Sequence, residues 1–592
     1  METQAVLAQC SLFAGLPALA LSRLAALCTP QELHGGEILF RAGEPSEHFY
    51  VVASGLLRVD AADGAYAGEV ARYEPLGEIS LLSGEPHSAV VRALRDSLLL
   101  RIRRADLVTF LSTYPSALLA MTRVIVNRMR RNQRQAQLEA ARRARSRTLL
   151  PATPAIDAAL HARQLCQALA ESGVAVELID EQTVDAALGP AMAQTPIDHS
   201  ERHRRLMDWL NEREASGRHL LYCAAARDEP WTERCLRQSD RVLLLADAAQ
   251  APQPSAVLER VRAYAQRTPV DLLLLRPQGA PAGEVLAWRE RVGAGAHHFL
   301  CPDEPRDYAR LARLLSGRGI GLVLSGGGAR GFAHIGLIRA LEELEIPVDL
   351  ACGTSMGAFF AALLACGYEA RELHDIARAT FVEHNYLNDY VLPRVSLIRG
   401  RKFLNRLREI FGERRIEELR LPYFCVSTNL TQAKTVMHDH GPLALWVGTS
   451  MAVPGIAPPV VWRGDLLVDG AVTNSLPTDL MHALGRGPVI ASDVSTEAAL
   501  RAPGIEGPDP EALLRPERNT EHVSLIDILF GGIALTSESG VRQRASLADL
   551  YLRMPVSGVP LFGWKRLDDI AERGYRHALG PLADFKREWL KR

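Results

Sequence analysis

A glycine-rich turn is the first stretch of the chain whose residue types could do chemistry. In 322-LVLSGGGARGFAHIG-336, an apolar run ends at Ser325 and a helix-like segment begins after the glycines. A strand that ends in glycines and opens a helix presents backbone N–H groups and the positive end of the helix dipole to an anion. That anion could be a bound phosphate or one that exists only during a reaction. The residues that could face it are Gly326, Gly327, Gly328, Arg330 and Gly331.

Two phosphate-binding motifs are partly matched by this turn. Gly326, Gly328 and Gly331 satisfy the G-x-G-x-x-G dinucleotide fingerprint, which also requires an acidic residue at the end of the next strand. Asp349 lies at about the right separation but begins the next predicted strand, 349–352, instead of ending it. A P-loop would require Gly-Lys-Ser/Thr, and none follows. Neither phosphate site is therefore favoured.

The second strand runs into a motif that suits a nucleophilic serine. Gly-x-Ser-x-Gly, here 353-GTSMG-357, stands between that strand and the apolar segment 358-AFFAALLAC-366, which is the context of a nucleophile elbow. Gly353 and Gly357 would leave room for the sharp turn. The hydroxyl of Ser355 would then stand at a helix N-terminus, where the dipole favours a developing negative charge.

With a serine nucleophile nearby, we interpret the glycine turn as an oxyanion hole. The N–H groups of Gly327, Gly328 and their neighbours would point at the oxygen of a tetrahedral intermediate. Glycine suits this position because the backbone itself must approach the substrate. Arg330 would either steady the turn or meet a lipid phosphate, and the sequence does not decide between the two.

The serine needs a base, and an aspartate is the best candidate. In 466-LLVDGAVTNSLP-477 an apolar strand ends at Asp469, and two minimal residues, Gly470 and Ala471, follow, so the carboxylate could lie against another loop. We expect His334, inside the helix after the glycine turn, to be a packed or capping residue. The other histidines that follow the turn lie in no motif that would present a base: His374, His384, His438, His440 and His482.

The motifs GGGARG, GTSMG and DGA, in this order and context, resemble those of the patatin-like phospholipases. The resemblance covers residues 318–480 and implies a Ser355–Asp469 dyad that works without a histidine. It also implies two-step acyl transfer on (lyso)phospholipid esters, with no metal and no cofactor. As a base, an aspartate of ordinary pKa near 3.9 is weak, so we expect burial beside Val468 and Met356 to raise the pKa of Asp469.

The N-terminal region, residues 1–115, predicts a β-barrel or jelly roll, because short alternating strands are separated by glycine turns. Within it, 77-GEISLLSGEPHSAVVRAL-94 resembles the phosphate-binding cassette of the cyclic nucleotide-binding domains. Gly77 and Glu78 match the Gly-Glu pair of that family, and Ser88 begins its small pair. His87 stands where the family has an arginine for the cyclic phosphate, so we expect weak nucleotide binding, if any.

The rest of the chain adds a linker and two α/β regions. Residues 116–147 predict a basic helical linker, which could instead be an exit helix or a basic face on anionic lipid. Residues 148–315 alternate strand-like and helix-like runs, which predicts a parallel α/β domain. Its first turn, 151-PATPAIDAAL-160, has no glycine, so we expect a structural or docking role. Residues 316–592 would form the patatin-like α/β hydrolase domain. With a cyclic-nucleotide-type barrel upstream, the whole chain resembles the neuropathy target esterase family.

Composition restricts the remaining function classes. The 592 residues are 47% hydrophobic and 23% charged, which predicts three or four globular domains. A net charge of −1 gives no pull toward nucleic acid, so no such partner is expected. Nine cysteines without a Cys-x-x-Cys pair indicate a reducing cytosol and argue against a disulfide framework or zinc ribbon.

We therefore predict a cytoplasmic serine esterase that meets its phospholipid or lysophospholipid substrate as a peripheral membrane protein. No signal peptide is recognisable at the N-terminus, and no apolar run has the length of a transmembrane helix. Homo-oligomerisation, with the barrel as a docking or dimer module, stays open. Two alternatives are a cyclic-nucleotide sensor with an inert patatin platform, and a thioesterase, protease or other serine hydrolase.

Overall fold

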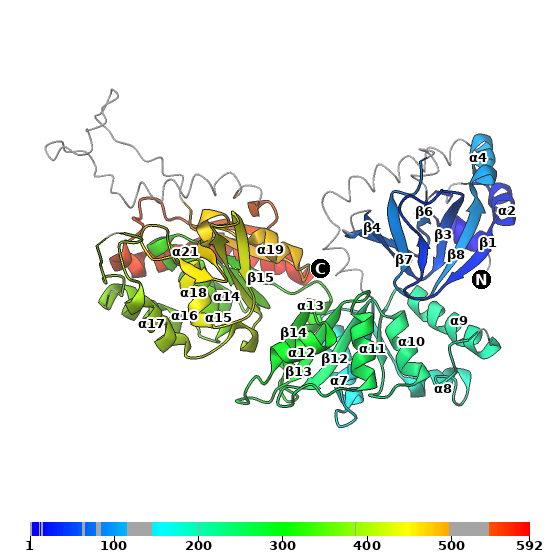
Figure 1. The fold of residues 1–592 in the computed structure, drawn as a ribbon, viewed down its shortest axis with the longest axis horizontal. Helices are drawn as coiled ribbons and strands as arrows, with labels where there is room; N and C mark the ends of the chain where they lie inside the picture. The colour runs from blue at the N-terminus through cyan, green and yellow to red at the C-terminus, as the bar shows by residue number, and fades with distance from the viewer. Residues whose placement is uncertain are drawn as a thin grey trace. The chain divides into compact units, whose positions relative to one another are not determined.

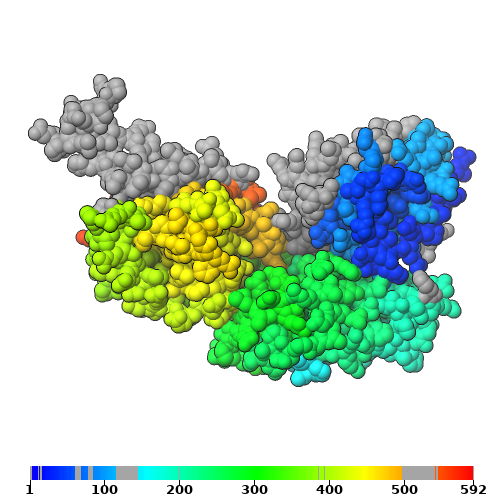
Figure 2. All heavy atoms as spheres, in the orientation of Figure 1, coloured from blue at the N-terminus to red at the C-terminus, as the bar shows by residue number. Residues whose placement is uncertain are grey.

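The structure is a computed structural model, and its chain divides into two compact units, Met1–Ala312 and Arg313–Arg592. Each unit is described by itself below; Figure 1 traces the chain, and Figure 2 draws its atoms in the same colours. Two sequence predictions lie outside the described residues, namely Glu78 and most of the linker at 116–147. The described residues are 3–10, 12–13, 16–61, 66–77, 85–114, 145–198, 200–384, 386–392, 394–495, 541 and 544–591.

The N-terminal unit begins with an antiparallel jelly roll, as the sequence predicts. Helices α1 (Thr3–Gln9), α2 (Ala18–Ala26) and α4 (Arg104–Thr113) flank it. One sheet has the order β1 (Thr29–Leu33), β8 (Ser97–Arg103), β3 (His48–Ser54), β6 (Pro75–Leu76). The other has the order β2 (Ile38–Phe40), β7 (Ala89–Ala93), β4 (Leu56–Ala61), β5 (Tyr66–Ala71).

The second part of this unit is the predicted parallel α/β domain. Its strand order, β10-β11-β9-β12-β13-β14, places the first strand in the middle of the sheet. The strands are β9 (Ser146–Pro151), β10 (Val176–Ile179), β11 (His219–Cys223), β12 (Arg241–Asp247), β13 (Val270–Leu275) and β14 (Ala296–Leu300). The sequence does not predict β14. Parallel strands are usually continuous apolar runs, whereas the residues of β14, AHHFL, include two histidines.

Helices connect these parallel strands, as crossover connections require. Most have an N-cap side chain that accepts a backbone N–H: Asp157 for α7, Asp180 for α8, Ser200 for α9 and Ser255 for α11. The helices are α7 (Ala158–Glu171), α8 (Glu181–Leu188), α9 (Glu201–Ala215), α10 (Pro230–Gln238), α11 (Ala256–Tyr264), α12 (Val285–Val292) and α13 (Pro305–Leu315).

The C-terminal unit is built on one mixed sheet of order β19-β20-β17-β16-β15-β21-β22, with β18 also paired to β17. The strands from β17 through β16, β15 and β21 to β22 are parallel, whereas β18, β19 and β20 pair antiparallel. The strands are β15 (Gly321–Leu324), β16 (Leu350–Gly353), β17 (Tyr423–Asn429), β18 (Lys434–His438), β19 (Val460–Trp462), β20 (Asp465–Asp469), β21 (Val489–Asp493) and β22 (Leu550–Arg553).

Both faces of this sheet are covered. Successive side chains of β15 point to opposite faces, and those on each face pack into a different core cluster. Leu322 and Leu324 belong to a core cluster with residues of α14, α15 and α21, whereas Val323 belongs to another with Met481 of α19. Helix α15 is buried along nearly its whole length, as its apolar sequence predicts. The α-helices are α14 (Ala333–Glu343), α15 (Met356–Ala365), α16 (Ala370–Ala377), α17 (Arg401–Phe411), α18 (Leu443–Ser450), α19 (Thr478–Ala483) and α21 (Leu567–Lys591).

Two glycines let α21 lie directly against α14. A Cβ on Gly336 would be 2.0 Å from the carbonyl oxygen of Ala571, and one on Gly574 would be 2.3 Å from that of Ala333. The close approach fixes the C-terminal helix against the helix that follows the glycine turn.

Candidate active site

Strand pairing brings the glycine turn and the serine motif together. β15 and β16 are parallel neighbours with Leu324 opposite Gly353, so the loops after them leave the same edge of the sheet. The carboxyl ends of parallel strands are the usual place for a site in an open α/β sheet. A Cβ on Gly326 would lie 3.2 Å from Cβ of Ser355, so glycine at this position allows the turn to touch the serine.

Ser355 has the strained backbone of a nucleophile elbow. Its φ is 54° and its ψ is −121°, a region that residues with a side chain rarely adopt. The flanking glycines make this turn possible, since a Cβ on Gly353 would meet the carbonyl carbon of Gly357 at 2.3 Å. A Cβ on Gly357 would meet the carbonyl oxygen of Leu324 at 2.1 Å. The elbow therefore depends on both glycines of the motif.

Asp469 lies within hydrogen-bonding distance of the serine. Ser355 Oγ donates to Asp469 Oδ2 over 2.7 Å, and the backbone N–H of Ala471 donates to Oδ1 over 2.8 Å. The carboxylate ends β20, as the sequence predicts, and β20 pairs with β17. Gly470 permits the close fit, because a Cβ there would lie 2.5 Å from the carbonyl oxygen of Val426. Asp and Ser thus form a hydrogen-bonded pair from segments 114 residues apart.

Burial changes the acidity of this aspartate in the direction that a base needs. Loss of solvent raises the pKa of Asp469 to about 7, against the opposing effects of the Ala471 N–H and the Ser355 hydroxyl. A carboxylate that titrates near neutrality is a stronger proton acceptor than an ordinary aspartate and is still ionised in much of the population at pH 7.

The pH dependence of ester hydrolysis should report this titration. Because the protonated carboxyl cannot take a proton from Ser355, we expect kcat/KM to rise with pH through about 7 and then level off. A pH–rate profile with a water-soluble ester checks this. An activity that is already at its plateau at pH 5 would contradict the assignment of Asp469 as the base.

Within the glycine turn, the hydrogen bonds distinguish structural donors from available ones. Gly326 N–H donates to the carbonyl of Ser475 over 3.1 Å, and Ala329 N–H donates to that of Leu561 over 2.8 Å. Among the described residues, Gly327 and Gly328 N–H have no acceptor. Gly328 has a φ of 56°, and a Cβ on it would lie 2.5 Å from the Leu561 carbonyl oxygen. Gly327 and Gly328 are therefore the donors that remain for an oxyanion.

Two other residues of the turn support its shape. Arg330 Nε donates to the carbonyl of Val559 over 2.9 Å, which ties the turn to the segment before α21. Of the two roles that the sequence left open for Arg330, this contact matches the steadying one. Gly331 packs under the elbow, since a Cβ there would lie 2.4 Å from Cγ of Met356.

The buried histidines have structural contacts. The two ring nitrogens of His334 lie 2.9 Å from Ser492 Oγ and 3.0 Å from the carbonyl oxygen of Ser325, so the ring braces the start of the turn. Burial lowers the pKa of His334 to about 4. His438 contacts Ser427 Oγ at 2.7 Å and stacks on Trp446, and burial lowers its pKa to about 4 as well. Neither histidine is bonded to Ser355.

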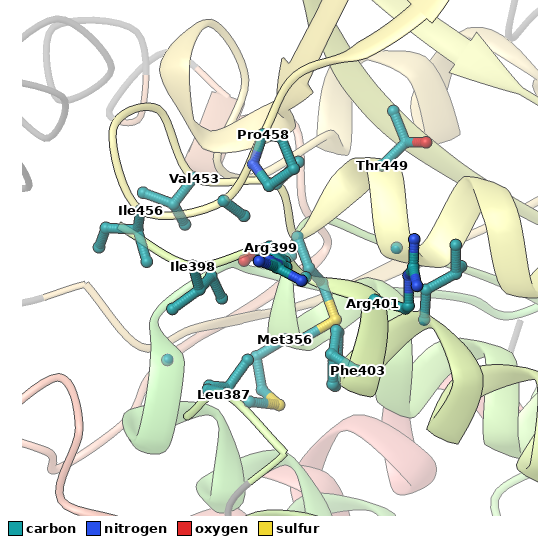
Figure 3. Close-up of a pocket in the computed structure, with 18 of the residues that line it drawn as sticks. Met356, Leu387, Ile398, Arg399, Arg401, Phe403, Thr449, Val453, Ile456 and Pro458 are labelled. Carbon is teal, nitrogen blue, oxygen red and sulfur yellow. The ribbon is translucent and has the colours of Figure 1, made fainter. Parts of the chain in front are cut away.

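The serine opens into a largely apolar cavity of about 360 Å³ (Figure 3). This volume lies in the range of ligand pockets. Gly328, Ser355 and Met356 form part of its wall, so the cavity reaches both the serine of the elbow and one of the two N–H groups without an acceptor among the described residues. The rest of the wall comes mainly from apolar side chains, among them Phe381, Leu387, Ile398, Phe403, Val453 and Trp564.

Sequence reasoning missed this cavity. Apart from Gly328, Ser355 and Met356, its wall comes from segments between residues 381 and 408, 445 and 460, and 561 and 564, none of which carries a motif that predicts a cavity. The one signal that could have been used is α17, whose stretch 401-RKFLNRLREIF-411 has apolar residues at helical spacing.

In the jelly roll, the described residues of the cyclic-nucleotide cassette, 77 and 85–94, do not present a free cation. The ring of His87 is buried and stacks on Phe40, with centroids 3.6 Å apart, and loss of solvent lowers its pKa. Arg92, the nearest alternative, has its Nε 3.7 Å from Asp60 Oδ2. Gly77 has a φ of 88°, as a tight turn requires, and Ser88 directly precedes β7.

We therefore expect this domain to bind cyclic AMP or cyclic GMP weakly, if at all. Loss of a charge-assisted hydrogen bond to the phosphate lowers affinity by about ten- to a hundredfold. Calorimetry with each nucleotide, and ester hydrolysis with and without it, would check this. Micromolar or tighter binding, or a severalfold change in activity, would show the expectation to be wrong.

Two features of the described residues concern metal ions and membranes. Among these residues, no group of three or more His, Cys, Asp or Glu side chains is arranged to hold a metal ion. In the same part of the chain, no helix combines the length and the hydropathy that a membrane span requires.

Three regions of the chain each match the model of a known protein family. The family described as Patatin-like phospholipase matches residues 322–482, and the Cyclic nucleotide-binding domain matches residues 30–114. The Neuropathy Target Esterase family P-loop like domain matches residues 144–305. The fold and the site thus define a patatin-type α/β protein with a cyclic-nucleotide-type domain and a P-loop-like domain upstream.

Proteins that match this chain over nearly its whole length identify its family. The chain is 30% identical over 580 residues to an uncharacterized NTE family protein of Mycobacterium tuberculosis, covering 95% of this chain and 93% of that protein. This chain therefore belongs to the neuropathy target esterase (NTE) family. It is 29% identical over 611 residues to patatin-like phospholipase domain-containing protein 7 of Rattus norvegicus, covering 93% of this chain but 45% of that protein. The chain thus spans about half the length of such relatives.

A solved structure matches part of this chain. The N-terminal domain of a transcriptional regulator from Streptomyces coelicolor A3(2) is 30% identical, with a TM-score of 0.19, and the match covers 22% of this chain and 94% of that one.

Proposed function

We propose that this chain is a serine esterase that hydrolyses the fatty-acyl esters of lysophospholipids and phospholipids through a Ser–Asp dyad. The observation that carries the proposal is the 2.7 Å hydrogen bond from Ser355 Oγ to Asp469 Oδ2, at the wall of an apolar cavity. Relatives named patatin-like phospholipase domain-containing protein 6 and 7 support a lipid ester as the substrate class.

The first half of the reaction acylates the serine. Asp469 takes the proton of Ser355 Oγ as the oxygen attacks the ester carbonyl carbon, and the carbonyl oxygen becomes an oxyanion. The free N–H groups of Gly327 and Gly328 stabilise that charge. When the tetrahedral intermediate collapses, the ester C–O bond breaks, and the leaving alkoxide takes the proton from Asp469.

The second half regenerates the enzyme with the same groups. Asp469 takes a proton from a water molecule, which attacks the acyl-Ser355 carbonyl, and the same N–H groups hold the second oxyanion. The bond to Ser355 Oγ then breaks, Oγ regains the proton, and the fatty acid leaves. Since one carboxylate accepts and returns each proton, no histidine is needed.

The alternative functions differ in which substrate they predict. An inert platform would not need Asp469 with a pKa raised to about 7 beside a serine in a strained elbow. A thioesterase or protease could use the same dyad, but the apolar wall of the cavity favours an acyl chain over a peptide.

The deciding experiment compares three acyl donors with the purified protein. Lysophosphatidylcholine, an acyl-coenzyme A of the same chain length and a casein-type peptide are incubated separately, and fatty acid or peptide release is measured. We expect turnover of the lysophospholipid to exceed that of the others. Turnover of the thioester or peptide alone would reassign the chain to another class of serine hydrolase.

We further propose that the protein is cytoplasmic and reaches its substrate at a membrane surface as a peripheral protein. A loop beside the cavity exposes apolar side chains: Tyr390 is 74% exposed, Leu392 82% and Val395 67%. The backbone N–H of Val391 donates to the carbonyl of Leu397 over 3.0 Å, so the loop folds back on itself. Exposed apolar residues on such a loop suit insertion into a lipid interface.

Sedimentation with liposomes tests this proposal. We expect the protein to bind vesicles and to be released by a carbonate wash, and the double variant L392E/V395E to bind severalfold less. L590E is the control, because Leu590 is 67% exposed, as Val395 is, but lies near the end of α21, where its neighbour Trp589 donates to the carbonyl of Arg318 over 3.2 Å. Retention through the carbonate wash, or equal loss in the control, would contradict the proposal.

A further inference from the structure

The cavity that contains Ser355 has an uneven distribution of charge. The described residues of its lining include Arg399, Arg401 and Arg408, and no aspartate, glutamate or lysine. All three arginines are exposed, whereas Ser355 and most of the apolar wall are buried or half-buried. The cavity is therefore apolar around the nucleophile and cationic at its solvent-exposed side. A ligand with an acyl chain at one end and a negative charge near the other would match both parts.

Two of these arginines have no side-chain partner in the part of the chain that the structure describes. Among the described residues, neither Arg399 nor Arg401 makes a side-chain hydrogen bond or an ion pair, and Figure 3 shows both among the lining side chains. Basic neighbours on α17 are engaged: Lys402 Nζ donates to Asn388 Oδ1 over 2.9 Å, and Arg406 Nη1 lies 3.2 Å from Glu409 Oε2. Arg408, the third arginine of the lining, donates to Asn405 Oδ1 over 3.4 Å. In the described part of the segment from Arg399 to Arg408, Arg399 and Arg401 are therefore the cavity arginines whose side chains stay available to a ligand.

The end of α17 does not itself supply the anion site. Asp389 already accepts from the backbone N–H groups of Gly400, over 3.3 Å, and of Lys402, over 3.2 Å. An incoming anion would therefore meet the arginine side chains and not the helix N-terminus. Guanidinium groups suit a phosphate particularly well, because each can donate two parallel hydrogen bonds to its oxygens.

We propose that Arg399 and Arg401 bind the phosphate of the substrate head group and so select anionic phosphoesters over neutral acyl glycerols. This inference rests on the lipid-esterase function proposed above and assigns the head-group side of the same site. With the scissile carbonyl at Ser355 and the acyl chain against the apolar wall, only the glycerol unit separates the ester from the phosphate. The phosphate must then lie close to the catalytic serine, at the polar part of the wall.

Paired soluble substrates separate this role from general binding. An octanoyl lysophosphatidylcholine and octanoylglycerol share the ester and the acyl chain but differ in the phosphate, and both are used below their micelle-forming concentrations. For R399Q and R401Q we expect kcat/KM on the lysophospholipid to fall about tenfold or more each, mostly through KM. On octanoylglycerol we expect less than a twofold change. R371Q is the control, because Arg371 is exposed on α16 and lies outside the cavity lining.

Each other outcome has a definite meaning. If the variants lose kcat/KM equally on both substrates, or on neither, the arginines do not bind the phosphate and the inference is wrong. If only vesicle-bound substrate is affected while monomeric lysophospholipid is not, the arginines contact the bilayer surface, which also overturns it. If the wild-type protein hydrolyses neither lipid, the proposed function itself fails. That result is distinguishable because it appears before any arginine is changed.

Discussion

Replacing Ser355 with alanine should abolish ester hydrolysis, lowering kcat by several orders of magnitude, as removal of a catalytic nucleophile does in other serine hydrolases. The fold should survive, because alanine keeps the Cβ that the elbow already accommodates at a φ of 54°. The measurement is fatty-acid release from lysophosphatidylcholine by wild type and variant, with circular dichroism to compare their folds. Labelling by a fluorophosphonate probe should disappear in parallel.

Ser427→Ala provides the matched control for this experiment. Ser427 is fully buried and has a histidine within hydrogen-bonding distance, His438 at 2.7 Å, but it does not line the cavity. We expect this variant to keep most of its activity and its probe labelling. If Ser355→Ala retained more than a few per cent of turnover in a pure preparation, Ser355 would not be the nucleophile.

The hydrogen-bonded pair could be found from the sequence because both of its members end strands in short motifs. GTSMG and DGA each place a functional side chain directly after a run of apolar residues, so the motif fixes the residue and the strand fixes its direction. The parallel pairing of β15 with β16 then makes the glycine turn a neighbour of the elbow. Predictions of this kind need only local spacing and the rule that strand ends share an edge.

Contacts between distant segments could not be found in the same way. The carbonyl that holds Arg330 belongs to Val559, 229 residues further along the chain, and the acceptor of Gly326 N–H belongs to Ser475. No pattern in the glycine turn says which of its N–H groups will be occupied. The cavity wall depends similarly on the packing of α17 against α18, so no motif in the sequence singles out Arg399 and Arg401.

Replacing Asp469 with asparagine should be nearly as damaging to catalysis as the loss of Ser355, because the amide cannot accept the proton. Kinetics on lysophosphatidylcholine would measure the loss, with His438→Asn as a control for a buried polar residue outside the cavity lining. His334→Asn and His440→Asn should also reduce activity far less than Asp469→Asn. A histidine variant as inactive as Asp469→Asn would replace the dyad with a triad.

The same variant should also change how stability depends on pH. Burial raises the pKa of Asp469 from an ordinary 3.8 to about 7 in the folded state. Between these values the unfolded chain has released the proton while the folded protein keeps it, so wild-type stability falls as pH rises. The asparagine side chain of the variant has no such proton to lose. From pH 5 to pH 7 the free energy of unfolding of Asp469→Asn, relative to wild type, should therefore rise by about 2–3 kcal/mol. Denaturant unfolding at the two pH values measures this difference. A constant difference would mean that Asp469 is ionised throughout and its pKa is not raised.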